Sequence, residues 1–493
     1  MLLPALLTVG CAVPREAPVQ PEPIQNLLFI MGDDHSTGVF GAYGSSLIRT
    51  PSLDQLAVQG VRFERAYVNS PFCTPSRQSL ITGKLPHAVG VTLLATPLDD
   101  GQTTISEHLK GFGFRTGAVG KMHFNSRLRH GFDHRIDRGH YREWLETMDP
   151  SQPRETTRVR PPWRPFRDPA HSWLNADVLL GSQTDERSEG TYFAGKAIEF
   201  LRTESEQRFC LWFSLAEPHS PFNFPIEYSG KYNPADMTIP EVGPDDDALI
   251  PAIFRDLTEH DKKGIIASYY TSVESLDKNV GLVLEELELL GLAGKTLVVY
   301  VGDHGYLLGH HGRFEKHTMW EEVVRDPLLV RGPGIAPAVN QAMVEFVDLV
   351  PTILELLGIP PLSGVQGESF QEILRGQARE HRRSIFAEYL PDNKAMLRTR
   401  RWEYIFTSGQ HDLTLGYATG NLPTGIKHRL YDMVEDPQEF TNLADRPELA
   451  ETLRSLQRQL LDRFKHTDLR ADQLPPDLDV SEALAWFCEP PEG

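Results

Sequence analysis

The chain has 493 residues, of which 40% are hydrophobic and 24% charged, so it can bury a large core and is not of the disordered class. Lys and Arg total 49 against 68 Asp and Glu, which gives a net charge of −19 and excludes a protein that wraps nucleic acid in a basic field. No apolar run reaches the roughly 18 residues that a membrane-spanning helix needs. Since the overall field repels anions, any anion site must be built locally from a few placed cations.

The N-terminus has the pattern of an export segment. Residues 1–11 form a short apolar stretch that ends in Gly10-Cys11, and a Pro- and Glu-rich linker follows over 12–23. This pattern is similar to the end of a bacterial lipoprotein signal, in which Cys11 would be lipidated after cleavage. No Lys or Arg precedes the apolar run, so the alternative is a disordered N-terminal segment. We expect a periplasmic or cell-envelope protein rather than a cytoplasmic one, with lipidation at Cys11 left open.

The region up to about residue 380 alternates between apolar runs and amphipathic segments. In chain order, the pattern predicts a strand over 26–31, a helix that Thr50 caps and Gly60 closes, a helix over 103–109, a strand over 115–119, a helix over 190–203, a strand over 208–214, a helix over 258–290 and a strand over 295–301. Strands that alternate with helices predict a three-layer α/β domain with a largely parallel sheet.

The pattern changes after about residue 381. Short strands are expected over 384–390, 395–399 and 402–407, and an amphipathic helix over 447–464, which together indicate a smaller α+β domain. We therefore expect a signal-like segment and linker over 1–23, a catalytic domain over 24–380 and a C-terminal subdomain over 381–493. Residues 138–185 are rich in Pro, Arg and Trp, and this insertion is expected to shape the rim of a site.

Two of the predicted strands end in hard metal ligands. Asp33-Asp34 follows the first strand, and Asp303-His304 follows the strand over 295–301. The carboxyl ends of strands in open α/β sheets are where sites form. Three carboxylates that meet there would repel one another unless a divalent cation neutralised them, and oxygen-rich ligation favours Ca²⁺ or Mg²⁺ over Zn²⁺.

The segment Cys73-Thr74-Pro75-Ser76-Arg77 is the most specific feature of the chain. Thr74 and Pro75 predict the cap and first turn of a helix, which would place Cys73 at a positive helix end. A thiol in that position would be acidified, so the residues alone favour a nucleophilic cysteine.

The same segment, followed by a Leu-Ile-Thr-Gly stretch at 80–83, resembles the signature of the type I sulfatases of the alkaline phosphatase superfamily. The resemblance implies an alkaline-phosphatase-like three-layer α/β sandwich with a smaller C-terminal α+β domain. It also implies that a dedicated maturing enzyme oxidises Cys73 to Cα-formylglycine. Further segments resemble the other motifs of the family in chain order: 26–34, 120–124, 217–222, 303–316 and 430–443.

The resemblance also implies roles for individual residues. One Ca²⁺ would be held by Asp33, Asp34, Asp303, His304 and the modified Cys73. Arg77 would orient the hydrated formylglycine, and Lys121 and Lys316 would bind the sulfuryl oxygens. His219 would donate a proton to the leaving oxygen, and His123 would take one from the second hydroxyl of the hydrate.

Other interpretations stay open for some of these residues. His123 and His219 can be structural or surface histidines, and Lys316 can be a solvated helix residue. His310, His311 and His317 match no ordered zinc-ligand spacing, so we expect them on the rim of the site. His304 stands where many members of the family have Asn. It resembles the choline-sulfatase, iduronate-sulfatase and phosphonate-monoester-hydrolase branches, which leaves the choice among Ca²⁺, Mg²⁺ and Mn²⁺ open.

The sequence thus predicts an exported sulfuric-ester hydrolase that acts on a sulfated carbohydrate. Its partners would be that substrate and a formylglycine-generating or equivalent maturing enzyme, with no nucleic acid and no transmembrane segment. The alternatives are a phosphonate monoester or phosphodiester hydrolase, a choline-type sulfatase, or a catalytically silent carbohydrate-binding relative. Retention of the whole catalytic set argues against the silent relative.

Overall fold

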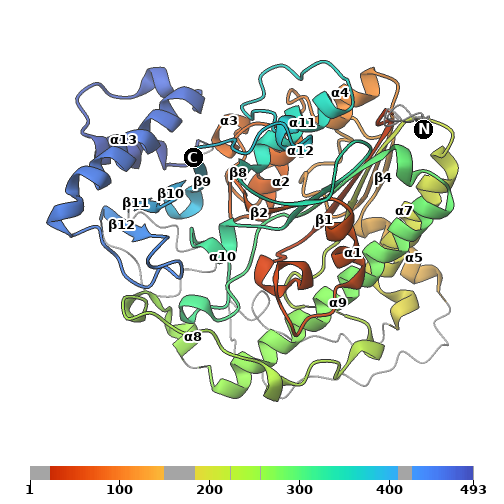
Figure 1. Ribbon diagram of the computed structural model, residues 1–493, viewed down its shortest axis with the longest axis horizontal. Coiled ribbons are helices and arrows are strands. Elements are labelled where there is room, and N and C mark those ends of the chain that lie inside the picture. Colours follow the sequence, from red (N-terminus) through yellow and green to blue (C-terminus); the bar gives the residue numbers. More distant parts are fainter. Residues whose placement is uncertain (1–22, 149–183, 223, 256, 409–424, 492–493) are drawn as a thin grey trace, which may run out of the picture.

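The computed structural model describes residues 23–148, 184–222, 224–255, 257–408 and 425–491. Two sheets organise the chain (Figure 1). The larger has eight strands in the order β4-β3-β5-β1-β6-β7-β2-β8, and the smaller has four in the order β12-β11-β10-β9. The predicted α/β class with a small C-terminal α+β domain is confirmed.

The larger sheet is parallel except at β7. Its strands are β1 (Asn26–Gly32), β2 (Val61–Tyr67), β3 (Arg115–Gly120), β4 (His134–Ile136), β5 (Phe209–Ser214), β6 (Thr296–Gly302), β7 (Leu328–Arg331) and β8 (Ala338–Glu345). β7 runs antiparallel to both of its neighbours, β6 and β2. Strands β1, β5 and β6 are adjacent and buried along their whole length, because helices cover both faces of the sheet.

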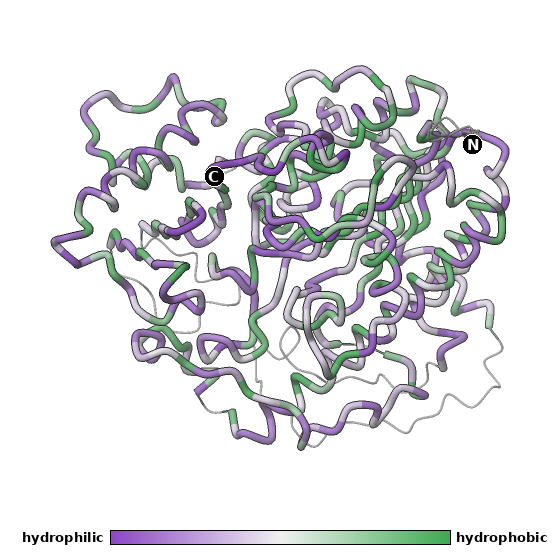
Figure 2. The backbone as a smooth tube through the Cα atoms, viewed as in Figure 1, coloured by the Kyte–Doolittle hydropathy of each residue, from purple (hydrophilic) through white to green (hydrophobic). Residues whose placement is uncertain are grey.

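Helices form the outer two layers around this sheet. One face carries α1 (Pro51–Gln59), α5 (Arg138–Thr147), α7 (Glu189–Glu204) and α9 (Glu259–Leu289), and its core joins Leu28 and Ile30 of β1 to Leu276 of α9. The opposite face carries α2 (Cys73–Thr82), α3 (Pro86–Val89), α4 (Ile105–Gly111), α11 (Leu349–Leu356) and α12 (Gln371–Leu374). Figure 2 shows apolar strands running through the middle of the molecule.

The smaller sheet is antiparallel. It consists of β9 (Ser384–Tyr389), β10 (Lys394–Thr399), β11 (Trp402–Thr407) and β12 (Lys427–Asp432), and α13 (Ala450–Thr467) and α14 (Val480–Phe487) pack on it. Two short helices, α8 (Ala252–Arg255) and α10 (Glu321–Val324), complete the described α-helices. The boundary between the catalytic and C-terminal parts near residue 380 stays a prediction.

Some details of the structure differ from the sequence-based predictions, although up to β6 every predicted element is present with ends within two residues of expectation. Thr50 precedes α1 but its side chain does not cap the helix, because its hydroxyl oxygen instead accepts from the backbone N–H of Gly41 at 3.0 Å. Residues 1–22 and 149–183 lie outside the described residues, and with them lie Cys11 and most of the expected rim insertion. No helix within the described ranges is long and apolar enough to span a membrane.

Candidate active site

The two acidic strand ends lie side by side. β1 and β6 are parallel neighbours with Gly32 opposite Gly302, so the residues that follow them emerge at one edge of the sheet. The backbone N–H of Asp34 donates to Asp303 Oδ1 at 2.9 Å. Asp33, Asp34, Asp303 and His304 are all fully buried.

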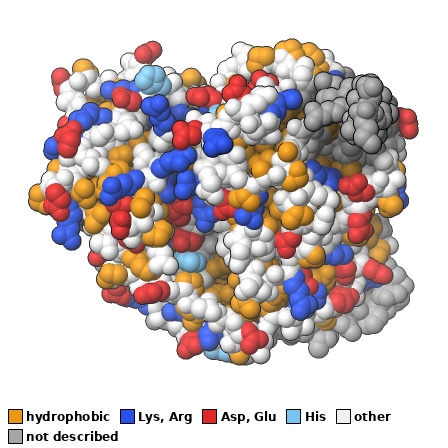
Figure 3. Space-filling view, viewed as in Figure 1, with side chains coloured by type: hydrophobic (Ala, Val, Ile, Leu, Met, Phe, Trp, Pro, Cys, Tyr) orange, Lys and Arg blue, Asp and Glu red, His pale blue; other side chains and the backbone are white. Residues whose placement is uncertain are grey.

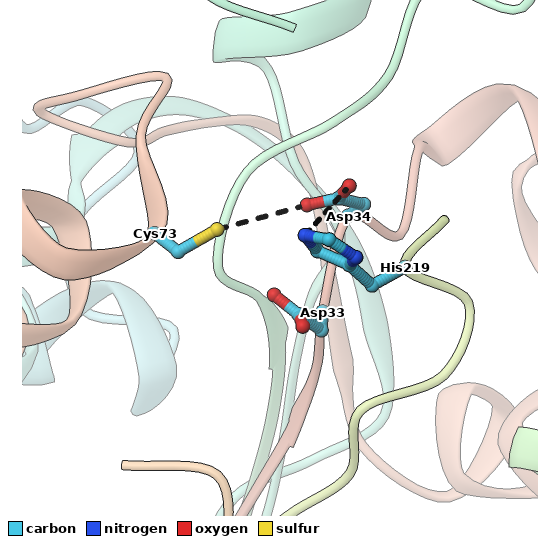
Figure 4. A group of neighbouring side chains, drawn as sticks. All are labelled: Asp33, Asp34, Cys73 and His219. Carbon is cyan, nitrogen blue, oxygen red and sulfur yellow. Dashed lines mark hydrogen bonds and ion pairs between the residues drawn. The ribbon is translucent and has the colours of Figure 1, made fainter. Parts of the chain in front are cut away.

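Cys73 faces this cluster from α2. Its Sγ lies 3.0 Å from Lys316 Nζ, 3.2 Å from His304 Nε2 and 4.0 Å from Asp34 Oδ1. Figure 4 shows the thiol pointing toward Asp34, with Asp33 and His219 on the facing side. Helix α2 begins at Cys73 itself, with Phe72 before it, so the expected cap at Thr74 is wrong by two positions.

The expected acidification of the thiol is also wrong. Burial raises the pKa of Cys73 to about 12, and the charges of Lys121 and Lys316 offset only part of that effect. Cys73 is buried among carboxylates that disfavour a further negative charge, so the helix N-terminus does not determine the pKa of the thiol. An unmodified Cys73 is therefore a neutral thiol near pH 7.

Arg77 ties α2 to both strand ends. Its Nε donates to Asp303 Oδ2 at 2.7 Å, and its Nη2 lies 3.3 Å from Asp33 Oδ1. Its Nη1 donates to Ser214 Oγ at 2.7 Å and to the carbonyl oxygen of Lys121. Arg77 thus fixes the positions of the carboxylates and of the loop after β3.

Two lysines supply local positive charge. Lys121 Nζ pairs with Asp33 Oδ2, and Lys316 Nζ lies 2.7 Å from Asp34 Oδ1. Burial would raise the pKa of Asp33, but Lys121, His219 and Arg77 outweigh it and hold that pKa well below its ordinary value. Over the face drawn in Figure 3, basic and acidic side chains are interspersed. The local cations thus make an anion site feasible in a chain of charge −19.

Hydrogen bonds fix the tautomers of two histidines. His304 Nδ1 lies 3.0 Å from the carbonyl oxygen of Gly305, and His219 Nδ1 lies 2.5 Å from that of Ser220. A carbonyl oxygen only accepts, so each Nδ1 carries the hydrogen. The Nε2 lone pair of each ring therefore faces the cluster, 3.4 Å from Asp34 Oδ1 for His304 and 3.9 Å from Asp34 Oδ2 for His219.

His123 is oriented by Thr74. The Thr74 hydroxyl donates its single hydrogen to the carbonyl oxygen of Leu94 at 2.9 Å, and its oxygen lies 3.2 Å from His123 Nδ1. His123 Nδ1 must then donate to Thr74 Oγ1, which leaves Nε2 as a proton acceptor. Gln78 holds the same residue by donating to its carbonyl oxygen at 2.5 Å.

The donor set fits a hard divalent cation. Ligand atoms of Asp33, Asp34, Cys73 and His219 lie within 4.8 Å of one another, as do those of Cys73, Asp303 and His304. Asp33 Oδ1 and Asp34 Oδ2 are buried and accept no hydrogen bond from the described residues. Buried carboxylate oxygens without donors, next to an imidazole Nε2, suit Ca²⁺, Mg²⁺ or Mn²⁺.

Several positioning residues were not predicted. Thr74, Ser76 and Gln78 lie on the first turns of α2, and Ser76 Oγ donates to the carbonyl oxygen of Asp303 at 2.5 Å. Their only sequence signal is their place beside Cys73 and Arg77. Two of the histidines expected on the rim are instead buried: His311 pairs with Asp246, and His317 packs against the rings of Phe72 and Tyr389.

This chain is similar to family models and to known proteins over most of its length. The family model described as Sulfatase matches residues 25–359, and one described as N-sulphoglucosamine sulphohydrolase, C-terminal, matches 309–466. An N-acetylglucosamine-6-O-sulfatase of Bacteroides thetaiotaomicron is 26% identical, covering 97% of this chain and 92% of its own. A choline-sulfatase of Rhizobium meliloti is 27% identical, with 86% and 83% covered. The solved phosphonate monoester hydrolase of Agrobacterium radiobacter superposes with a TM-score of 0.75 at 22% identity, covering 91% and 97%.

Proposed function

The chain belongs to the sulfatase family, and from that premise we propose that it hydrolyses sulfate esters of a carbohydrate through a formylglycine made from Cys73 and a bound Ca²⁺. The observation that carries the proposal is the convergence of Arg77, Lys121 and Lys316 with the buried aspartates around Cys73. This arrangement offers positive charge to a sulfate ester and acidic ligands to a cation at one edge of the sheet.

Asp33, Asp34, Asp303 and His304 would hold the cation, together with the modified side chain at position 73. When bound, Ca²⁺ supplies a charge that acidifies the attacking hydroxyl and neutralises the three carboxylates. His304 suits this role because Gly305 holds its Nδ1 hydrogen and leaves Nε2 free to coordinate.

The conversion of Cys73 has a chemical reason. Hydrated formylglycine supplies one hydroxyl to attack sulfur and a second whose deprotonation lets sulfate leave as the aldehyde re-forms. The buried thiol of Cys73 supplies neither, since its pKa is raised to about 12 and a thiol-bound sulfuryl group would have no internal route of release. Pro75 and Arg77 would also serve the maturing enzyme as recognition residues before the chain folds.

The remaining roles fall to the chain's own bases and cations. Lys121 and Lys316 would bind the sulfuryl oxygens and stabilise the charge that shifts as the S–O bond breaks. Burial, with Lys316 and Lys121, lowers the pKa of His219 well below its ordinary value. A sulfate ester bound between those lysines would counter their effect. We therefore expect His219 to gain the proton that it donates to the leaving oxygen when substrate binds.

His219→Ala tests the general acid. We expect turnover of unactivated sugar sulfates to fall about 10²–10⁴-fold, because a poor alcohol leaving group needs the proton. Turnover of nitrophenyl sulfate should fall less than about 10-fold, because nitrophenolate leaves without protonation. Steady-state rates on both substrates give the comparison, and equal losses would remove His219 from the role.

Thr74→Val tests the tautomer of His123. Without the hydroxyl, either ring nitrogen of His123 can carry the hydrogen, and the base is no longer fixed toward the site. We expect kcat to fall about 10–100-fold. Thr74→Ser is the matched control and should retain most of the activity. Formylglycine content is measured in each variant, so that poor maturation is not mistaken for lost base catalysis. An unimpaired, fully matured Thr74→Val would contradict this role.

The substrate class is tested by one panel. Rates on sulfated mono- and oligosaccharides, including a glucosamine 6-sulfate, are compared with those on choline sulfate and on aryl phosphate and phosphonate esters. We expect the highest kcat/KM on a sulfated sugar. A preference for choline sulfate or for a phosphonate monoester would instead favour the branches that His304 resembles.

We also propose export to the cell envelope, which fractionation and the mass of the mature N-terminus would test.

A further inference from the structure

A second group of ligand-type side chains lies away from Cys73, where the larger sheet meets the C-terminal subdomain. Ligand atoms of His311, Glu322 and Glu439 all lie within 4.8 Å of one another. His311 comes from the turn His310–Gly312, Glu322 from α10, and Glu439 from the segment after β12. Figure 1 shows α10 between the two sheets. We refer to these three residues, with Glu403 of β11, as the junction cluster.

The junction cluster is short of hydrogen-bond donors, and all of its members are buried except Glu322, which is partly exposed. Glu403 is 0% exposed, and His311 and Glu439 are each 1% exposed. Both carboxylate oxygens of Glu403, Oε1 of Glu439 and Oε2 of Glu322 accept no hydrogen bond from any residue that the structure describes. Glu403 lies against the carboxylate of Glu439, and two ionised carboxylates cannot donate to each other.

The nearby arginines are engaged elsewhere. Arg398 Nε lies 2.8 Å from Glu321 Oε1 but 3.6 Å from Glu403 Oε2, and Arg325 Nε lies 2.9 Å from Glu321 Oε2. His310 reaches only Oε1 of Glu322, at 3.2 Å. Three carboxylates, two of them fully buried, thus share only His310, His311 and a long contact to Arg398 as basic partners. This arrangement is costly unless protons or a cation neutralise it.

His311 has the support that metal-binding histidines usually have. Its Nδ1 lies 2.9 Å from Asp246 Oδ1, and its ring stacks on Trp320 with centroids 4.0 Å apart and planes 9° apart. Its Nε2 then faces Glu322 Oε2 at 3.6 Å. A carboxylate on the far nitrogen fixes the ring and makes the other nitrogen a better ligand.

We propose that His311, Glu322 and Glu439, with Glu403 as a further donor, bind a divalent first-row cation of the Mn²⁺ or Zn²⁺ type. Imidazole nitrogen and carboxylate oxygen are both ligands that Mn²⁺ and Zn²⁺ accept, so this donor set fits these ions. Of the junction cluster, Glu322 lines a cavity of about 430 Å³, together with His310, Glu321 and Arg398. The ion would join the catalytic part to the C-terminal sheet.

The alternative is that the cluster holds protons. Burial raises the pKa of Glu403 to about 8. Burial opposes protonation of His311, but Asp246 and Glu322 raise its pKa to about 9. A cluster that holds only protons would bind no metal, so counting the bound cation separates the two alternatives.

The experiment counts Mn²⁺ bound by the full chain, by paramagnetic resonance, with Ca²⁺ in excess to occupy the Cys73 site. We expect one Mn²⁺ per wild-type chain. Affinity should fall at least about 100-fold in Glu439→Gln and in His311→Gln. The exposed Glu435→Gln, on the same segment as Glu439, is the matched control and should bind like the wild type.

Two results would overturn the proposal: no Mn²⁺ bound by the wild type under these conditions, or equal binding by wild type, Glu439→Gln and His311→Gln. Circular dichroism checks that each variant folds. If Glu439→Gln and His311→Gln both fail to fold, Mn²⁺ binding by Glu403→Gln decides. This change removes a carboxylate whose oxygens accept no hydrogen bond from the described residues. The result does not depend on the sulfatase proposal, since it is the difference in Mn²⁺ binding between the wild type and the junction variants, and no activity is measured.

Discussion

Cys73→Ala is expected to lower kcat/KM on sulfate esters about 10⁴-fold or more, because it removes the side chain from which the nucleophile is made. In the wild type, activity should be proportional to the fraction of chains in which Cys73 is formylglycine. Mass analysis of the tryptic peptide that contains Cys73 measures that fraction. Expression with and without a compatible maturing enzyme then gives two preparations whose activities should differ in the same ratio as their formylglycine contents.

Two further variants sharpen this test. Cys73→Ser should be inactive, or trap a sulfated enzyme, in a host that cannot oxidise serine. Cys210→Ala is the matched control, because Cys210 is a buried free thiol on β5 and should affect neither maturation nor turnover. Fully active protein with only unmodified cysteine at position 73 would overturn the formylglycine mechanism and restore the cysteine nucleophile.

The strands that build the site were predictable, whereas others in the same sheet were not. β1 and β6 are buried on both faces and therefore read as unbroken apolar runs. β2 was missed because three of its seven residues, Arg62, Glu64 and Arg65, are charged. Their side chains are partly exposed, and Arg62 Nε donates to Glu64 Oε1 at 2.9 Å. Such a strand is defined by its partners β7 and β8 and not by its own periodicity.

In the site, too, the types of residue could be predicted from the sequence, whereas their environment could not. The motifs brought Cys73, Arg77 and the acidic strand ends to attention, and the register of β1 against β6 follows from strand order. The pKa of Cys73 could not be foreseen, because it depends on packing against residues far away in the chain. Lys316 contacts Asp34, which lies 282 positions away in the chain. Only the folded chain shows that burial of the Cys73 thiol outweighs the effect of the Lys316 charge on its pKa.

Buried histidines were the least predictable. His311 and His317 lie in a polar segment, so the sequence suggests exposure. In the structure, Trp320 stacks on His311, and the rings of Phe72 and Tyr389 pack against His317. These aromatic contacts join segments from α2, α10 and the C-terminal sheet, which no local pattern connects.

Asp303→Asn is the second variant with a large expected effect. Asp303 Oδ1 accepts from the backbone of Asp34 at 2.9 Å, and Oδ2 accepts from Arg77 Nε at 2.7 Å. An amide can keep one of these contacts, but it removes an anionic ligand from the proposed cation site. We expect kcat/KM to fall about 10²–10³-fold, the range found when one group that stabilises transition-state charge is lost. The Ca²⁺ concentration for half-maximal activity should rise.

The fold should survive this change. Removing one of three buried carboxylates relieves their mutual repulsion, and Arg77 keeps Asp33 Oδ1 at 3.3 Å and Ser214 Oγ at 2.7 Å. The matched control is Asp133→Asn, which breaks an ion pair with Lys110 outside the site and should leave the Ca²⁺ dependence unchanged. Activity is titrated against Ca²⁺ after exhaustive chelation. If Asp303→Asn keeps wild-type turnover in chelator, Asp303 does not hold a catalytic cation, and its role is confined to positioning Arg77.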